Sequence, residues 1–311
     1  MMGSDTDDRW CRRPKRIACI GEAMIELALD STGSNAQIGV AGDTLNTAVY
    51  LRRNWAGDVA DVAYVTAIGS DPMSDRIADF IRSQQISDDL VIRCPDRMPG
   101  LYSIKTDAAG ERTFSYWRDT SAARQLFQSG IGPDLDALAA FDAVFLSAIT
   151  LAILPAPMRA TLLDWLATYR TRGGLVIFDS NYRPRLWPDR DVARRDIGRA
   201  WAQTDIGLPS VDDEIAVFGD PDAQGVMQRL KTAGVRLGAL KRGEAGPLPL
   251  SGDAIDQPYP AATKIVDTTA AGDSFNGGFL ASWASGGSQA EALLAGHNCA
   301  RAVVGIAGAF G

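Results

Sequence analysis

A run of small and acidic residues near the end of the chain, residues 267–278 with the sequence DTTAAGDSFNGG, has the composition of a phosphoryl-transfer centre. Small residues let backbone N–H groups approach an anion closely. The apolar stretch that follows, residues 279–283, predicts a helix whose first turn is this run, and the N-terminus of such a helix favours a phosphate. Asp273 would stand beside that phosphate as the base for an attacking hydroxyl. The alternative is a glycine-rich turn with a helix-capping aspartate, and spacing alone leaves it open.

Three further polar turns stand where ligands of an open parallel sheet bind, at the carboxyl ends of strands. Residues 179–183 follow one apolar run of strand length and residues 241–243 follow another, while residues 42–46 open the first predicted helix. The 267–278 run itself follows Ile265 and Val266. We therefore expect these four segments to line one cleft for a substrate and a nucleotide.

The elements that must position these turns alternate between short apolar runs and helical patterns. Apolar runs without alternation are typical of strands that are buried on both faces of a parallel sheet. The pattern predicts an α/β sandwich with a mainly parallel central sheet. The predicted strands are residues 16–21, 62–67, 143–146, 175–178 and 237–240, and the predicted helices are residues 44–53, 73–84, 158–169, 192–203 and 223–233.

One stretch, from about residue 90 to 118, departs from this rhythm. Residues 101–106 and 112–117 alternate as strands do, and the small residues 108–110 between them predict a hairpin. Within an α/β core this hairpin, with a segment near residues 30–42, is expected to form a small β lid over one end of the sheet. An edge hairpin without a role is the alternative. We expect a single domain, residues 16–311, after a disordered tail at residues 1–15.

Composition narrows the classes of function. The chain has 311 residues, 46% of them hydrophobic and 22% charged, as in ordinary globular proteins. A net charge of −7 argues against a nucleic-acid partner, and the absence of an apolar run of about 18 residues argues against a membrane span. The four cysteines show no paired spacing, and the N-terminus has no apolar secretory core, so we expect a cytoplasmic protein. With His297 as the only histidine, a carboxylate is the expected general base.

From about Arg16 to the C-terminus the chain resembles the ribokinase-like (PfkB) carbohydrate kinases. The 267–273 run resembles their Asp-Thr-x-Gly-Ala-Gly-Asp signature, and the 42–46 turn resembles their N-terminal sugar-binding turn. Residues 116–124 and 179–187 resemble one branch of the family, which acts on 2-keto-3-deoxygluconate. The resemblance implies a three-layer sandwich with a β lid, and ATP-dependent phosphorylation of that sugar acid at its terminal (6-) hydroxyl.

The resemblance also implies roles for individual residues. Asp273 resembles the catalytic base, and the backbone from Ala270 through Ala271 and Gly272 resembles the anion hole for the transferring phosphoryl group. The remaining implied contacts are with the sugar, from Gly42, Asn46, Tyr102, Tyr116, Arg118, Asn181 and Arg183, and with the nucleotide, from Ser210, Lys241, Gly243, Gly246, Gly272 and Asn298. Asp213 is the implied Mg²⁺ residue. The resemblance also implies ATP and Mg²⁺ as cofactors, together with a monovalent cation, and a homodimer formed through the lid.

The two arginines point to an acidic substrate on physical grounds as well. A guanidinium is best matched by a carboxylate or phosphate, so Arg118 and Arg183 could converge on one anionic group. Taken singly, each would be a surface residue that pairs with an acidic neighbour. A kinase for a neutral sugar such as fructose or ribose, and a catalytically silent binding protein of the same fold, are the alternatives.

The sequence departs from the family pattern at several positions. Ala41 and Ala270 stand where glycine is usual, which an alanine tolerates if its φ is negative. Ser210 and Asp213 stand where the family has Asn-x-x-Glu, so Glu214 competes with Asp213 for the metal role. Pro247 and Pro249 are expected to interrupt the strand that would follow the 241–246 turn.

Overall fold

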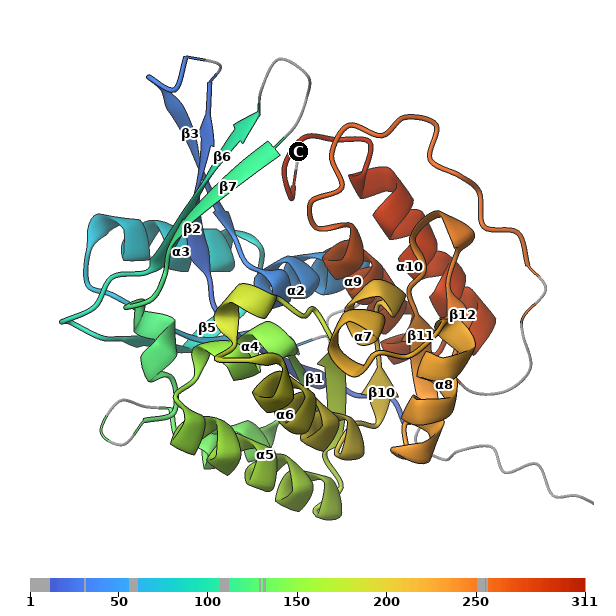
Figure 1. Ribbon diagram of the computed structural model, residues 1–311. Helices are drawn as coiled ribbons and strands as arrows, with labels where there is room; N and C mark the ends of the chain where they lie inside the picture. The colour runs from blue at the N-terminus through green and yellow to red at the C-terminus, as the bar shows by residue number, and fades with distance from the viewer. Residues whose placement is uncertain are drawn as a thin grey trace, which may run out of the picture.

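The structure, a computed structural model, describes residues 12–30, 32–55, 61–106, 112–128, 130, 133–250, 255 and 257–310. Its body is an eight-stranded sheet of order β12-β11-β10-β9-β8-β1-β4-β5, from which a four-stranded sheet of order β3-β2-β6-β7 rises (Figure 1). All neighbouring pairs in the body are parallel except β11 with β12. The body strands are β1 (Arg16–Ile20), β4 (Asp61–Ile68), β5 (Ser87–Arg93), β8 (Ala143–Ser147), β9 (Leu175–Asp179), β10 (Ile206–Gly207), β11 (Leu237–Leu240) and β12 (Leu248–Pro249).

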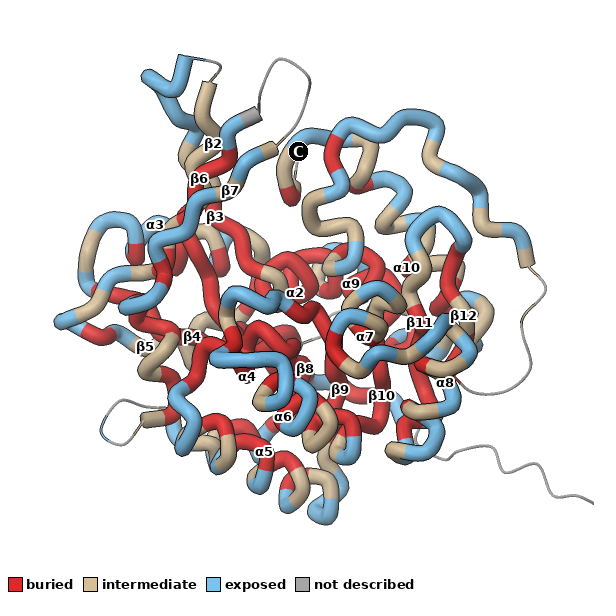
Figure 2. The backbone as a smooth tube through the Cα atoms, in the orientation of Figure 1, coloured by how far each residue is buried: buried red, intermediate tan, exposed pale blue. Residues whose placement is uncertain are grey.

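Helices cover both faces of the body sheet, and side chains alternate between the two cores. In β1, Ile17 and Cys19 lie in one core, and Ala18 and Ile20 lie in the other. The first core is closed by α2 (Asp43–Asn54), α3 (Pro72–Ser83), α9 (Ala271–Ala284) and α10 (Gln289–Val303). The second is closed by α4 (Ala148–Ile153), α5 (Ala156–Thr171), α6 (Arg190–Ala202), α7 (Val211–Phe218) and α8 (Ala223–Thr232). β8 and β9 are buried along their whole length, and β1 is buried from Ile17 to Ile20 (Figure 2), so the predicted three-layer sandwich is confirmed.

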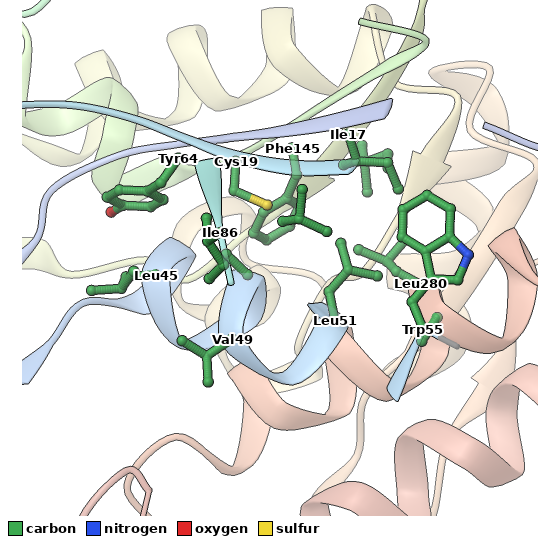
Figure 3. Packing of buried hydrophobic residues seen from close by; sticks show 14 of the residues in the cluster. Ile17, Cys19, Leu45, Val49, Leu51, Trp55, Tyr64, Ile86, Phe145 and Leu280 are labelled. Atoms are coloured by element: carbon green, nitrogen blue, oxygen red, sulfur yellow. The ribbon is translucent and has the colours of Figure 1, made fainter. Parts of the chain in front are cut away.

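Helix α9 is held between α2 and α10 by close backbone contacts. A Cβ at Gly277 would lie 2.4 Å from the Cβ of Tyr50 on α2, and a Cβ at Gly278 would lie 2.8 Å from the carbonyl oxygen of Ala295 on α10. Figure 3 shows the same core beside these helices, with Leu51 and Leu280 packed beneath the strands. Gly277 and Gly278, two of the three glycines in the 267–278 run, therefore pack α9 against its neighbouring helices, and they place its N-terminus beside the start of α2.

The second sheet is the predicted lid, with a different boundary. Its hairpin of β6 (Gly100–Thr106) and β7 (Arg112–Trp117) is confirmed, although the predicted turn at residues 108–110 lies outside the described residues. β2 (Met24–Leu29) pairs with β3 (Ala36–Ala41) and with β6, and adds a strand that was not predicted. The expectation that the lid begins near residue 90 is wrong, because β5 belongs to the body. β5 is the outermost strand there and is mostly half-buried, so its polar Ser87, Asp88 and Asp89 do not resemble the continuous apolar runs of the central strands.

The edge strand β12 differs from expectation, and the N-terminal segment joins the body before β1. Pro247 and Pro249 do not abolish the expected strand, because β12 is a two-residue edge strand and an edge position tolerates proline. Of the expected tail, residues 1–11 lie outside the described residues. The N–H of Lys15 donates to Asp142 at 2.8 Å, so the chain joins the body there. No helix in the described part of the chain is both long and apolar enough to cross a membrane.

Candidate active site

The N-terminus of α9 opens from a tight turn at residues 267–270. Ala270 precedes the helix with φ 59° and ψ 11°, which is the left-handed region, so the negative φ under which an alanine replaces glycine without strain is not present here. The N–H of Ala271 donates to Thr268 O at 3.2 Å, and that of Ser274 donates to Ala270 O at 2.8 Å. The N–H groups of Gly272 and Asp273 therefore stand at the open end of the helix, where a helix cannot pair them itself.

The carboxylate of Asp273 meets the predicted sugar-binding turn. Asn46 Nδ2 donates to Asp273 Oδ2 at 2.8 Å, and Thr47 Oγ1 donates to its backbone oxygen at 3.2 Å. Burial and the nearby charge of Asp43 raise the pKa of Asp273 to about 7, although the hydrogen bond from Asn46 opposes the shift. An aspartate with that pKa is a proton acceptor suited to neutral pH.

Gly42 is required by crowding rather than by its dihedral angles. Its φ of 167° is ordinary extended backbone. A Cβ at this position, however, would lie 2.2 Å from the carbonyl oxygen of Glu22. The close approach of these two segments brings the start of α2 into the site.

Asp43 joins three elements at the centre of the site, although the sequence singled out only the turn that contains it. Its Oδ2 accepts from Ser147 Oγ at 2.5 Å, at the end of β8, and from Asn181 Nδ2 at 2.9 Å, just after β9. Burial raises the pKa of Asp43, against the hydrogen bond from Ser147. Asn181, a predicted sugar contact, is thereby placed beside the first residue of α2.

A lysine stands beside the open end of α9. Lys241 Nζ donates to Asp179 Oδ2 at 2.9 Å and to Asn276 Oδ1 at 3.0 Å, and Asn276 Nδ2 donates to Asp179 at 2.7 Å. Lys241 Nζ lies 3.7 Å from where a Cβ of Gly272 would be. The ammonium group and the helix N-terminus together form a site for an anion. Sequence reasoning found Lys241 but missed Asp179 and Asn276, because their role depends on contacts between distant strands and helices.

The two predicted arginines have separate carboxylate partners. The Arg118 side chain is 6% exposed and donates from Nε at 2.8 Å and from Nη2 to Glu22, whose side chain is 1% exposed. Arg118 is therefore not a surface residue, and its charge is already matched. Arg183 is 55% exposed, and its Nη1 lies 3.5 Å from Asp213. Their convergence on one anionic group remains a prediction.

The lid presents an aromatic ladder on its inner face. The rings of Tyr102 and Tyr116 lie 5.7 Å apart, and Phe114 stacks beside Tyr116 at 6.3 Å. The hydroxyl of buried Tyr102 donates to Glu26, whereas Tyr116 is 49% exposed. Tyr102 shares a small buried cluster with Ala309, and Ala270 packs against it. The inner face of the lid therefore meets the turn that begins α9.

The remaining predicted residues are the proposed nucleotide contacts Ser210, Gly243, Gly246 and Asn298. Ser210 N donates to Ser180 Oγ at 3.0 Å, and a β-bridge pairs Ser210 with Lys241. Gly243 and Gly246 form a turn with φ values of 55° and 73°. Asn298 is exposed on α10. Among the described residues no side-chain hydrogen bond or ion pair joins Asn298 to the others, and its nucleotide contact remains a prediction.

Of the two acidic residues that compete for the metal role, only Asp213 faces the site. Glu214 is 0% exposed and accepts from Arg229 at 2.6 Å and Trp201 at 3.2 Å; burial raises its pKa to about 7. Glu214 therefore binds interior partners and does not reach the site. Burial also raises the pKa of Asp213, which neighbours Arg183. The described residues contain no cluster of three or more metal-binding side chains. A Mg²⁺ ion held by phosphates and one carboxylate fits such a donor set.

These features define a phosphoryl-transfer enzyme of the ribokinase-like fold: a mainly parallel sheet with a β lid, a carboxylate at a helix N-terminus and a lysine beside that carboxylate. Residues 14–310 match the pfkB family carbohydrate kinase model, and the chain belongs to this family. It is 44% identical over 305 residues to a 2-dehydro-3-deoxygluconokinase of Dickeya dadantii, covering 95% of this chain and 96% of that protein. It is 41% identical over 301 residues to the Escherichia coli K12 protein of that name, covering 95% and 97%.

A solved structure shows the same fold. A double-mutant fructokinase from Vibrio cholerae, in a form bound to fructose, ADP and potassium, superposes with a TM-score of 0.76 at 21% identity, over 96% of this chain and 95% of that one. At this identity the likeness concerns the fold alone.

Proposed function

We propose that this carbohydrate kinase transfers the γ-phosphoryl group of ATP to the 6-hydroxyl of 2-dehydro-3-deoxygluconate, also called 2-keto-3-deoxygluconate. The observation that carries the reaction type is the contact of Asp273, at the open end of α9, with Asn46 of the sugar-binding turn. The substrate is supported by relatives of that name at 41 and 44% identity.

In the proposed reaction Asp273 accepts the proton of the 6-hydroxyl as its oxygen attacks the γ-phosphorus, and ADP leaves. The N–H groups of Gly272 and Asp273 stabilise the charge on the transferring phosphoryl group. Lys241, oriented by Asp179 and Asn276, adds a fixed positive charge beside them. Lys241 is held by hydrogen bonds within the protein, and a charge fixed in this way needs little reorganisation in the transition state.

Mg²⁺ bound to the nucleotide phosphates would neutralise their charge, and Asp213 is the residue that would hold it. We include a monovalent cation in the proposal because a fructokinase of the same fold was solved with potassium. Replacing potassium by tetramethylammonium in the assay tests this part separately.

The proposed sugar pocket lies between the lid and the carboxyl ends of β8 and β9. Asn181, fixed by Asp43 at 2.9 Å, and Tyr116, exposed on the lid, would bind sugar oxygens. Arg183 keeps more than half of its side chain exposed, so it is available to bind the substrate carboxylate. The Glu22–Arg118 pair favours the second candidate, a neutral sugar, because it leaves no net charge at that part of the pocket.

A coupled assay for ADP with 2-dehydro-3-deoxygluconate, gluconate, fructose and ribose separates the candidates. Preference for the keto acid, with a 6-phosphate product identified by ³¹P NMR, supports the proposal. Preference for fructose or ribose would replace it with the neutral-sugar function. Nucleotide binding without turnover of any of the four would support a silent binding protein.

We propose in addition that two copies of this chain associate through their lids. β7 is an edge strand of the lid sheet, and its Trp117 is 61% exposed. Unpaired edges of this kind associate readily with another strand. Light scattering of the wild type and of Trp117→Glu tests this, since a monomeric wild type would end the proposal.

A further inference from the structure

One contact joins the lid directly to the turn that precedes α9. Arg112, the first residue of β7, donates from Nη1 to Asp267 Oδ1 and to Thr269 Oγ1, the latter at 2.9 Å. The Arg112 side chain is 25% exposed and that of Asp267 is 1% exposed. A buried carboxylate of this kind depends on its partners, because removing one of them leaves an uncompensated charge.

Asp267 connects three separate segments of the chain. Besides Arg112, it accepts from the N–H of Thr269 at 2.8 Å and from the N–H of Gly308 at 2.6 Å. Burial alone would raise the pKa of Asp267, but hydrogen bonds from Arg112 and Thr269 outweigh it and hold the pKa below its usual value. Asp267 is therefore ionised at neutral pH, and its three donors come from the lid, the turn and the C-terminal segment.

The turn that Asp267 holds sets the direction of the anion site. It ends at Ala270, whose left-handed backbone starts α9 and aims the N–H groups of Gly272 and Asp273. Ala270 also packs against the cluster of Met24, Tyr102 and Ala309, which contains lid residues. A displacement of β7 would therefore be transmitted to this turn through both a charged and an apolar contact.

We propose that Arg112 is a positioning residue, which acts through Asp267 to fix the anion site for the γ-phosphoryl group when the lid covers the sugar. In this role Arg112 acts through its contacts with Asp267 and Thr269 rather than on the substrates. The inference deepens the proposed kinase function and rests on it. It predicts that loss of Arg112 impairs the phosphoryl-transfer step more than it impairs sugar binding.

The test compares Arg112→Met, Asp267→Asn and the double variant by single-turnover kinetics. We expect each single variant to lower kcat about 10- to 100-fold, the scale on which a small misplacement of reacting groups acts. KM for the sugar should change by less than about threefold, because the sugar contacts are untouched. The double variant should resemble the single variants, since both changes break the same connection.

A matched control is available at the opposite end of the sheet. Arg170 pairs with Asp205 with side-chain exposures of 25% and 3%, close to those of Arg112 and Asp267. Arg170→Met should lower thermal stability without changing kcat. Arg112→Lys is a second variant in case Arg112→Met does not fold. It keeps the positive charge but not the planar guanidinium group, and its kcat should lie between those of the wild type and Arg112→Met.

Three results would overturn the inference. The first is an unchanged kcat in folded Arg112→Met or Arg112→Lys. The second is a rise in sugar KM alone, which would mean that Arg112 only closes the lid. The third is additive losses in the double variant, which would mean that Arg112 and Asp267 act independently.

A sugar-independent readout separates this inference from the proposed function. Calorimetry measures the affinities for ADP and for β,γ-methylene ATP, whose difference reports the γ-phosphoryl contact. Arg112→Met should lose most of that difference while its affinity for ADP remains. The wild type could fail to phosphorylate the keto acid and still bind the two nucleotides with different affinities, a difference that Arg112→Met loses. In that case the substrate assignment fails and the role of Arg112 stands. An unchanged difference would contradict the role of Arg112 whatever the substrate.

Discussion

The protonation state of Asp273 is expected to set how kcat depends on pH. With a pKa of about 7, the carboxylate form is about one tenth of the total at pH 6 and about nine tenths at pH 8. Only that form accepts a proton from the sugar hydroxyl. The rate of the chemical step should therefore rise about tenfold between pH 6 and pH 8.

Two substitutions should move this dependence in opposite directions. The charge of Asp43 raises the pKa of Asp273, so Asp43→Asn should lower it and bring the ratio of kcat at pH 6 to kcat at pH 8 closer to one. The hydrogen bond from Asn46 lowers that pKa, so Asn46→Ala should raise it. The ratio should then fall below about one tenth, towards the limit of about one hundredth for a group protonated throughout.

Rapid-quench single turnovers at saturating sugar and ATP measure the chemical step without product release. Asp273→Asn is the control, and should have a kcat lower by about 10²- to 10⁴-fold with no remaining dependence on this group. A wild-type rate that is level from pH 6 to pH 8 would refute the assignment. So would a shift of the same sign in Asp43→Asn and Asn46→Ala, because the structure gives those side chains opposite effects.

Three further substitutions test the site. Asp273→Asn should increase the free energy of unfolding at pH 8 by up to about 4 kcal/mol. The pKa of Asp273 in the folded protein lies above its value in the unfolded chain, so its destabilising effect is absent below about pH 4 and complete above about pH 7. An equal increase in the free energy of unfolding at about pH 4 and about pH 8, measured by urea titration, would contradict this explanation. Ala270→Gly should stabilise by about 0.5 kcal/mol, because relief of the positive φ exceeds the added chain entropy, and a net loss would show that the methyl packing dominates. Arg183→Ala should raise KM for the keto acid about tenfold or more with little change for a neutral sugar, whereas an unchanged KM would place that arginine outside the pocket.

Much of the architecture was predictable because local patterns agree with the fold. The apolar strands of the body, the amphipathic α3 and the lid hairpin all have the expected type and nearly the expected bounds. The failures lie where a pattern has two interpretations. β5 lacks the long apolar run of a central strand because it is a half-buried sheet edge, and the two-residue β12 contains a proline, which an edge strand tolerates.

By itself the sequence indicated the reaction type, because the 267–273 run combines small residues with Asp273 at a helix start and resembles a family signature, although its spacing alone left a capping turn open. It also indicated which turns share an edge of the sheet. The tertiary structure decided the partners: Asp43 with Asn181, Lys241 with Asp179, Arg118 with Glu22, and Arg112 with Asp267. Each pair is separated by more than 60 residues in the chain or joins the lid to the body, and no local pattern specifies which charge meets which. Burial then acts on these pairs together, and it is burial that raises the pKa of Asp273 into the range where it can serve as a base.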